Sequence, residues 1–179
     1  MEDSFDTNVD SDFRMALRKL QKKDTQTRLK ALEELKCLIE TKTQEDCVAI
    51  VSYWSKPYSK LTLDNERKIR ETCQQTHEKL VHKIGKSVAP ILKNIMPYWI
   101  LAQADSFLSS ARIAEAAFKS TFNQERQPEV VRFAKDEILN VNPEISPEIF
   151  KFYLSFNFKK KVLHEYLIVH TAKTLSDST

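Results

Sequence analysis

Cysteine and histidine are the residue types in this sequence best suited to metal binding and to nucleophilic chemistry. Cys73 and His77 are four residues apart, so a helix would place them on one face, where they could begin a metal site. No third ligand stands at a suitable spacing, and the other histidines are scattered (His82, His164 and His170). We therefore predict core positions for the pair, and no catalytic, cofactor-binding or metal-binding residue in this chain.

A group of basic residues forms a second candidate site. Arg14, Arg18 and Lys22 follow one another at i, i+4 and i+8, and Lys19 and Lys23 flank them. On one helix this spacing makes a basic strip that could contact RNA phosphates or an acidic protein surface. The alternative is an ordinary solvated helix face opposite an apolar stripe.

Two tryptophans, Trp54 and Trp99, are each preceded by a tyrosine and form a third candidate group. Such rings could build a cage around a ligand. Because the two tryptophans occupy matching places in the repeat described below, we favour buried positions in the core between repeats.

Helices are the elements that would position these side chains. Apolar residues from Phe13 to Leu20 fall at i, i+3, i+4 and i+7, which is the spacing of one apolar helix face. Ser11 is the predicted cap of this helix, and Asp24 is the predicted cap of the next. Further helices are predicted at residues 43–54, 64–84, 87–99, 109–122 and 129–139.

Four residues are predicted to set helix ends. Thr43 and Asp64 have the side chains that cap helix N-termini. Pro57 should end the helix before it, since proline lacks an amide hydrogen and clashes with the preceding turn. Gly85 stands where a left-handed C-terminal cap is expected.

Two sequence patterns recur at nearly the same interval. Residues 27–35 (TRLKALEEL) match residues 69–77 (IRETCQQTH) 42 positions later, with Arg28 aligned to Arg70. Residues 50–54 (IVSYW) match residues 95–99 (IMPYW) 45 positions later. Helix pairs that recur every ~40–47 residues are typical of HEAT and armadillo repeats. The sequence therefore predicts an all-α solenoid of antiparallel helix pairs of the HEAT/armadillo type.

Composition excludes several classes of protein. A single glycine in 179 residues argues against Rossmann turns, phosphate-binding loops and tight hairpins, which need residues that tolerate positive φ. A net charge of +3 does not by itself imply nucleic-acid binding. No apolar run approaches the ~18–20 residues of a membrane span. Three widely spaced cysteines indicate buried thiols in a reducing compartment, so we expect a cytosolic location. We also expect a monomer that binds no small-molecule substrate.

The chain divides into three parts. Residues 1–10 are acidic and polar, and we predict that they are disordered. Residues 11–141 carry the helical repeats. Residues 142–179 are rich in aromatic residues without a repeat register, and we predict a divergent tail that is partly helical or disordered.

Several segments taken in order resemble the N-terminal region of the listerin family: DSDFRMALRKLQKKD, ERKIRETCQQTHEKL, MPYWILAQAD and QPEVVRFAKDEI. This resemblance runs from about Asp10 to Val141. It implies a long HEAT/armadillo protein that ends in a zinc-binding RING domain and acts as a ubiquitin ligase in ribosome-associated quality control. It also implies that the N-terminal region docks on the large ribosomal subunit and on its partner NEMF.

The resemblance also sets limits on what this chain would do. We expect the match to fail after Val141, and no RING follows, so the chain would be a fragment, a short isoform or an imperfect gene model. It would bind rather than catalyse, with ligase activity and zinc confined to the full-length relative. Arg14, Arg18, Lys19, Lys22 and Lys23 are then candidate contacts with the ribosome, including its RNA, or with a partner. The alternative is a generic HEAT-repeat adaptor without a ribosomal role.

Overall fold

The structure is a computed structural model that describes residues 8–141. Within this part the chain is helical and contains no strand, which confirms the predicted all-α class. The α-helices are α1 (Ser11–Lys19), α2 (Thr25–Thr41), α3 (Gln44–Ala49), α4 (Val51–Thr62), α5 (Arg67–Ile84), α6 (Leu92–Ala102), α7 (Leu108–Thr121), α8 (Arg126–Phe133) and α9 (Lys135–Val141). A 3-10 segment, η1 (Gly85–Ile91), joins α5 to α6.

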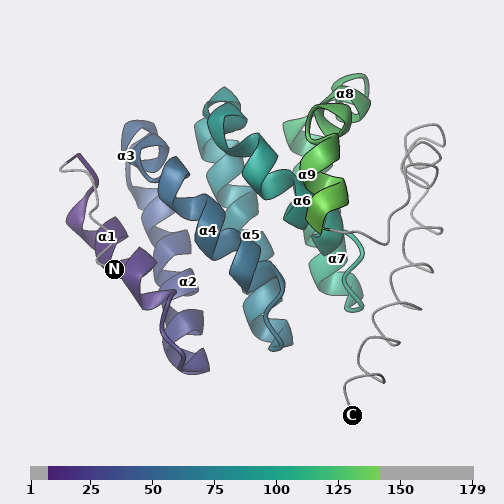
Figure 1. Ribbon diagram of the computed structural model, residues 1–179. Coiled ribbons are helices and arrows are strands. Elements are labelled where there is room, and N and C mark those ends of the chain that lie inside the picture. Colours follow the sequence, from purple (N-terminus) through teal and green to yellow (C-terminus); the bar gives the residue numbers. More distant parts are fainter. Residues whose placement is uncertain (1–7, 142–179) are drawn as a thin grey trace, which may run out of the picture.

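The helices are arranged in two layers (Figure 1). In one layer α2 packs on α5 and α5 packs on α7, while in the other α4 packs on α6 and α6 packs on α9. The layers are joined because α1 packs on α2, α4 on α5 and α6 on α7. One continuous core, which includes Trp54 and Trp99, fills the space between them.

Several predicted helix ends are confirmed. The Asp24 carboxylate accepts a hydrogen bond from the amide of Thr27 at 2.7 Å, and Thr43 with Asp46 forms a capping box at the start of α3. Gly85 follows the last residue of α5 with φ of 54°, a conformation that residues with a Cβ rarely adopt.

Other predicted ends are wrong. The cap of α1 is Asp10 rather than Ser11, because the Asp10 carboxylate accepts from the amide of Asp12. Helix α5 begins at Arg67, three residues after the predicted cap, Asp64. The Asp64 carboxylate instead accepts a hydrogen bond from the Arg28 guanidinium. The predicted helices 43–54 and 129–139 are both interrupted, at Ile50 and at Ala134.

Pro57 does not end its helix, since it lies inside α4 and is buried. Interior prolines cost a helix about 3 kcal/mol or more, because one backbone hydrogen bond is lost and the ring crowds the preceding turn. Trp54 and Tyr58, on either side of Pro57, are both fully buried. Packing of these rings holds α4 together across the proline.

The repeat alignment identifies equivalent core positions. Ala31 and Cys73 are both fully buried, as are Leu35 and His77. Trp54 and Trp99 are also fully buried, in agreement with their predicted core positions. Among the cysteines, Cys47 and Cys73 are buried as predicted, but Cys37 is exposed.

Residues 1–7 and 142–179 lie outside the described part, and with them most of the two predicted terminal segments. Of the predicted disordered segment 1–10, the last three residues are described. Val9 is buried in the core and Asp10 caps α1, so that part of the prediction is wrong.

Two aligned arginines link three successive turns of the structure. The Arg28 guanidinium donates to the carbonyl of Lys22 before α2 and to the Asp64 carboxylate before α5, the latter at 2.9 Å. The Arg70 guanidinium donates to the carbonyl of Asp64 at 2.8 Å and to the Asp105 carboxylate before α7 at 2.7 Å. The turns between the two layers are therefore held in register by an alternating series of arginine and aspartate.

Candidate functional site

His77 lies in an aromatic cluster, where it forms part of the core. Its ring stacks on Tyr58 at 4.2 Å between centroids and meets Trp99 edge-on at 4.4 Å. The Trp54 indole Nε1 donates to its Nδ1 at 3.1 Å. Among residues 8–141 no group of three or more histidine, cysteine, aspartate or glutamate side chains is placed to hold a metal ion.

Burial lowers the pKa of His77 from 6.5 to about 3, because a charged imidazolium cannot be solvated in this cluster. The unfolded chain takes up this proton near pH 6.5 and the folded chain only near pH 3, so stability falls as the pH decreases between these values. We expect the free energy of unfolding to fall by about 2 kcal/mol from about pH 7 to about pH 5. Urea denaturation at the two pH values measures it.

The matched control is His77→Leu, since leucine occupies the aligned position, Leu35. This variant should be less stable at neutral pH, because the Trp54 indole loses its acceptor. Its stability should nevertheless change little between the same two pH values. If the stability of the variant falls between these pH values as much as that of the parent chain, another group causes the loss.

The five basic residues of the predicted strip are placed at one end of the described helices, but they do not share one helix. Arg14 and Arg18 lie on α1, and Lys19 is its last residue. Lys22 and Lys23 follow in the turn before α2, so the prediction that one helix carries all five is wrong. Helix α1 ends at Lys19, and in the turn that follows the Arg28 guanidinium donates to the carbonyls of Lys22 and Lys23.

The five basic residues of the strip differ in their exposure and in their ion pairs. Lys19 forms an ion pair with Glu34 of α2 at 2.8 Å, and Arg14 is half-buried. Lys22 and Lys23 are exposed and make no ion pair with any other residue of the described part. The turn therefore offers two exposed lysines that no described carboxylate pairs with, and its carbonyls are bound by Arg28.

Sequence analysis did not identify Lys56 and Lys60 of α4 or Lys93 of α6 as candidates, although all three are exposed. Lys56 and Lys60 are four residues apart on α4, a spacing that a helix places on one face, whereas Lys93 comes from another helix. A second available signal was the absence of acidic residues, since none occurs in α4 or between residues 85 and 104.

Comparison with known proteins places these helices in a family. A family described as the N-terminal domain of the E3 ubiquitin-protein ligase listerin matches residues 8–150. The chain belongs to the listerin family. It is 39% identical to listerin of Gallus gallus and 38% identical to listerin of Mus musculus, over 175 residues in each case. Listerin of Drosophila melanogaster is 39% identical over 141 residues.

The extent of these alignments corrects one expectation. The match to the chicken and mouse listerins covers 98% of this chain, so the prediction that the resemblance fails after Val141 is wrong. The chain spans about 9% of the length of these two relatives. No solved structure matches the chain. No described helix is long and apolar enough to cross a membrane.

Proposed function

We propose that this chain is the N-terminal docking module of a listerin-type E3 ubiquitin ligase in ribosome-associated quality control. In this role it binds the large ribosomal subunit that carries a stalled nascent chain, together with NEMF, in the cytosol. It supplies binding, and another part of the ligase transfers ubiquitin. The observation that carries the proposal is the match of residues 8–150 to the N-terminal domain of listerin.

The proposed architecture is a HEAT/armadillo-type solenoid of antiparallel helix pairs. It is supported by the packing of α2 on α5 and of α5 on α7, and by the aligned arginines that join successive turns. Repeats of this kind contact mainly their neighbours, so an N-terminal group of repeats can fold and dock without the distant end of the protein.

The proposal is tested by sedimenting the full chain with purified large subunits that carry peptidyl-tRNA and NEMF. We expect the chain to pellet with these subunits and to remain in solution without them. Failure to pellet at low salt would overturn the docking role. Recovery of unrelated proteins and no ribosomal proteins would favour a general adaptor.

Lys22 and Lys23 form what we call the basic turn. We expect Lys22→Glu with Lys23→Glu to weaken subunit binding on the order of tenfold. The slope of log affinity against log salt concentration should fall by the amount expected for about two phosphate contacts. The folded state should be unaffected, since both side chains are exposed and Arg28 uses only the carbonyls. Sedimentation over a range of salt concentrations measures both effects.

The matched control makes the same change of charge at two exposed lysines outside this turn, one on α2 and one on α5: Lys30→Glu with Lys68→Glu. It should bind subunits like the parent chain. Equal losses in the two variants would mean that only net charge matters and that the basic turn has no special role.

A further inference from the structure

One surface of the described helices carries four lysines, three of which pair with no described carboxylate. It is formed by the outward sides of α4, η1 and α6, and neither α4 nor residues 85–104 contain aspartate or glutamate. Its lysines are all exposed, and they are Lys56, Lys60, Lys86 and Lys93. We name this surface the α4–α6 basic face.

The α4–α6 basic face is grooved. A cleft of about 400 Å³ lies between α4, α6 and α9. Most of its lining surface is apolar, and hydrogen-bonding groups within it come from Ser59, Asn94 and Tyr98. The Lys93 Nζ in this cleft is 3.0 Å from the Glu137 Oε1 of α9, so Lys56 is the lysine of the cleft that no described carboxylate pairs with.

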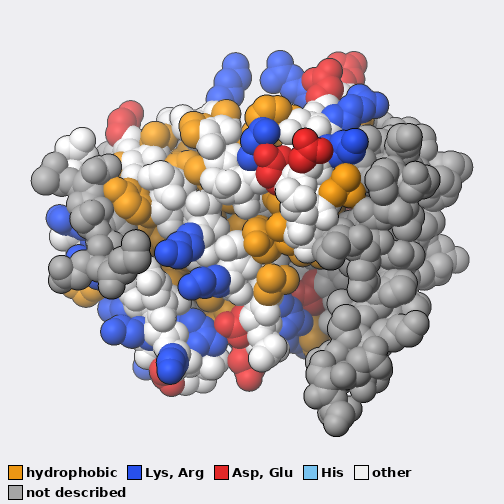
Figure 2. Space-filling view, viewed as in Figure 1, with side chains coloured by type: hydrophobic (Ala, Val, Ile, Leu, Met, Phe, Trp, Pro, Cys, Tyr) orange, Lys and Arg blue, Asp and Glu red, His pale blue; other side chains and the backbone are white. Residues whose placement is uncertain are grey.

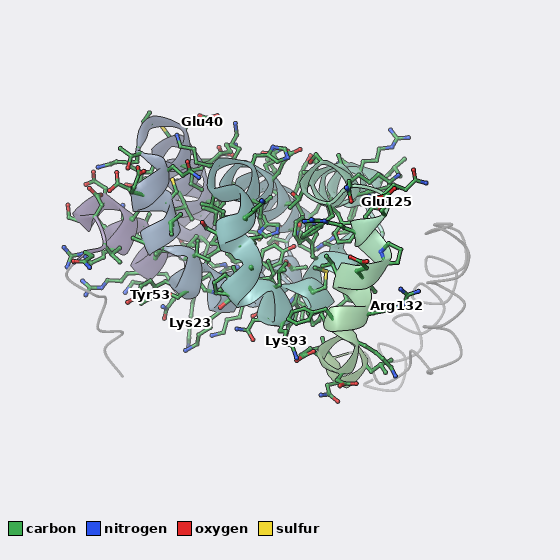
Figure 3. All side chains as sticks on the ribbon, turned by 90° about the horizontal axis from the view of Figure 1, so that it is seen from above. Lys23, Glu40, Tyr53, Lys93, Glu125 and Arg132 are labelled. Carbon is green, nitrogen blue, oxygen red and sulfur yellow. The ribbon has the colours of Figure 1, made fainter. Side chains whose placement is uncertain are left out.

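The opposite layer has a different balance of charge. Several lysines of α2, α5 and α7 are paired with glutamates there, as in Lys36 with Glu33, Lys79 with Glu40 and Lys119 with Glu115. Figure 3 shows Lys23, Tyr53 and Lys93 along one long side of the molecule and Glu40 on the other. In Figure 2 basic side chains lie over the middle of the α4–α6 side, with acidic ones toward its upper right and lower edge.

We propose that the α4–α6 basic face binds the sugar–phosphate backbone of RNA, which lies along the cleft. Several cations with few carboxylates favour a polyanion, and serine, asparagine and tyrosine can hydrogen-bond to phosphate and to the ribose 2′-hydroxyl. The choice of RNA over other nucleic acids rests on the proposed ribosomal function.

An acidic protein surface fits this face less well. Protein interfaces depend on large apolar or aromatic anchors that become fully buried. The exposed large hydrophobic residues of the described part are Met15, Val48, Leu63, Phe107, Leu108 and Phe133, and none of them lies on α4, η1 or α6. Phe133 of α8 borders the face, since the Lys93 ammonium lies over its ring. A surface with several lysines and one such residue at its edge matches a phosphate backbone better than a folded protein.

The test measures binding of the full chain to a fluorescein-labelled RNA hairpin without ribosomal protein, by anisotropy over a range of salt concentrations. We expect Lys56→Glu with Lys60→Glu to reduce affinity on the order of tenfold or more and to lower the salt slope by about two contacts. The control Lys30→Glu with Lys68→Glu carries the same charge change on the other layer and should bind like the parent chain. Circular dichroism confirms that each variant is folded.

Three results would overturn the inference. The parent chain could fail to bind the hairpin, the two double variants could lose equal affinity, or polyglutamate could displace the RNA at equal charge, which would indicate an acidic protein partner. The proposed docking role is tested separately. If the chain pellets with subunits but does not bind the hairpin, it docks through protein contacts and the RNA inference fails. If it binds the hairpin but not the subunits, the RNA inference stands and the ribosomal role fails.

Discussion

Trp99→Ala is expected to lower the free energy of unfolding by about 3–5 kcal/mol, as for other large buried aromatic residues cut to alanine. Trp99 is fully buried, and its ring contacts His77 on one side and Phe118 on the other. Its indole Nε1 also donates to the carbonyl of Ala114 at 3.0 Å, which ties α6 to α7. Removing it leaves a cavity between the two layers. Urea denaturation followed by circular dichroism measures the loss.

The matched variant Trp99→Phe separates packing from hydrogen bonding. It keeps an aromatic ring in the cluster but leaves the Ala114 carbonyl without its donor, so it should cost clearly less than the alanine variant. A denaturation curve for Trp99→Ala that coincides with the parent curve would show that the ring is not part of the folded core.

The second large effect is expected from Arg70→Met, which should cost about 3 kcal/mol or more. The side chains of Arg70 and Asp105 are 14% and 8% exposed, and the guanidinium makes two hydrogen bonds to this carboxylate. It also binds the carbonyls of Asp64 and Asn65. Removing one partner of a largely buried ion pair leaves the other charge uncompensated, which is strongly destabilising. Urea denaturation gives the value.

Two further variants identify the cause of this loss. Arg112 lies 42 positions after Arg70, is exposed and pairs with no carboxylate in residues 8–141, so Arg112→Met should have little effect. Adding Asp105→Asn to Arg70→Met removes the orphaned charge and should restore part of the stability. If the double variant is no more stable than Arg70→Met alone, the uncompensated carboxylate is not the source of the cost.

The sequence repeat predicts burial correctly at positions that the helix period places on the inner face. Trp54 with Trp99, and Ala31 with Cys73, were aligned by type and spacing, and both pairs are buried. Arg28 and Arg70 were also aligned, but their partners were not predicted. Asp64 had been interpreted as a helix cap, because a sequence pattern does not show which turns will lie side by side.

Features that depend on packing between distant elements were missed for the same reason. The interior position of Pro57 in α4 depends on the burial of its neighbours, which outweighs the local preference of proline. The α4–α6 basic face joins lysines that are far apart in the chain, such as Lys56 and Lys93. The spacing of the basic strip predicts one helix, but α1 ends at Lys19, and Arg28 of α2 binds a carbonyl of the turn that follows.

Under the proposed function, this chain docks at the same place on the large subunit as a full-length listerin. Sedimentation shows binding but not its location, so the most direct measurement is competition. A fixed amount of full-length ligase ubiquitinates a stalled reporter chain while this chain is titrated into the reaction. Docking at a shared site predicts that ubiquitin on the reporter falls as this chain occupies the subunit. A constant signal, with the chain shown to be folded, would mean that the ligase is held by multivalent contacts elsewhere and would contradict the claim.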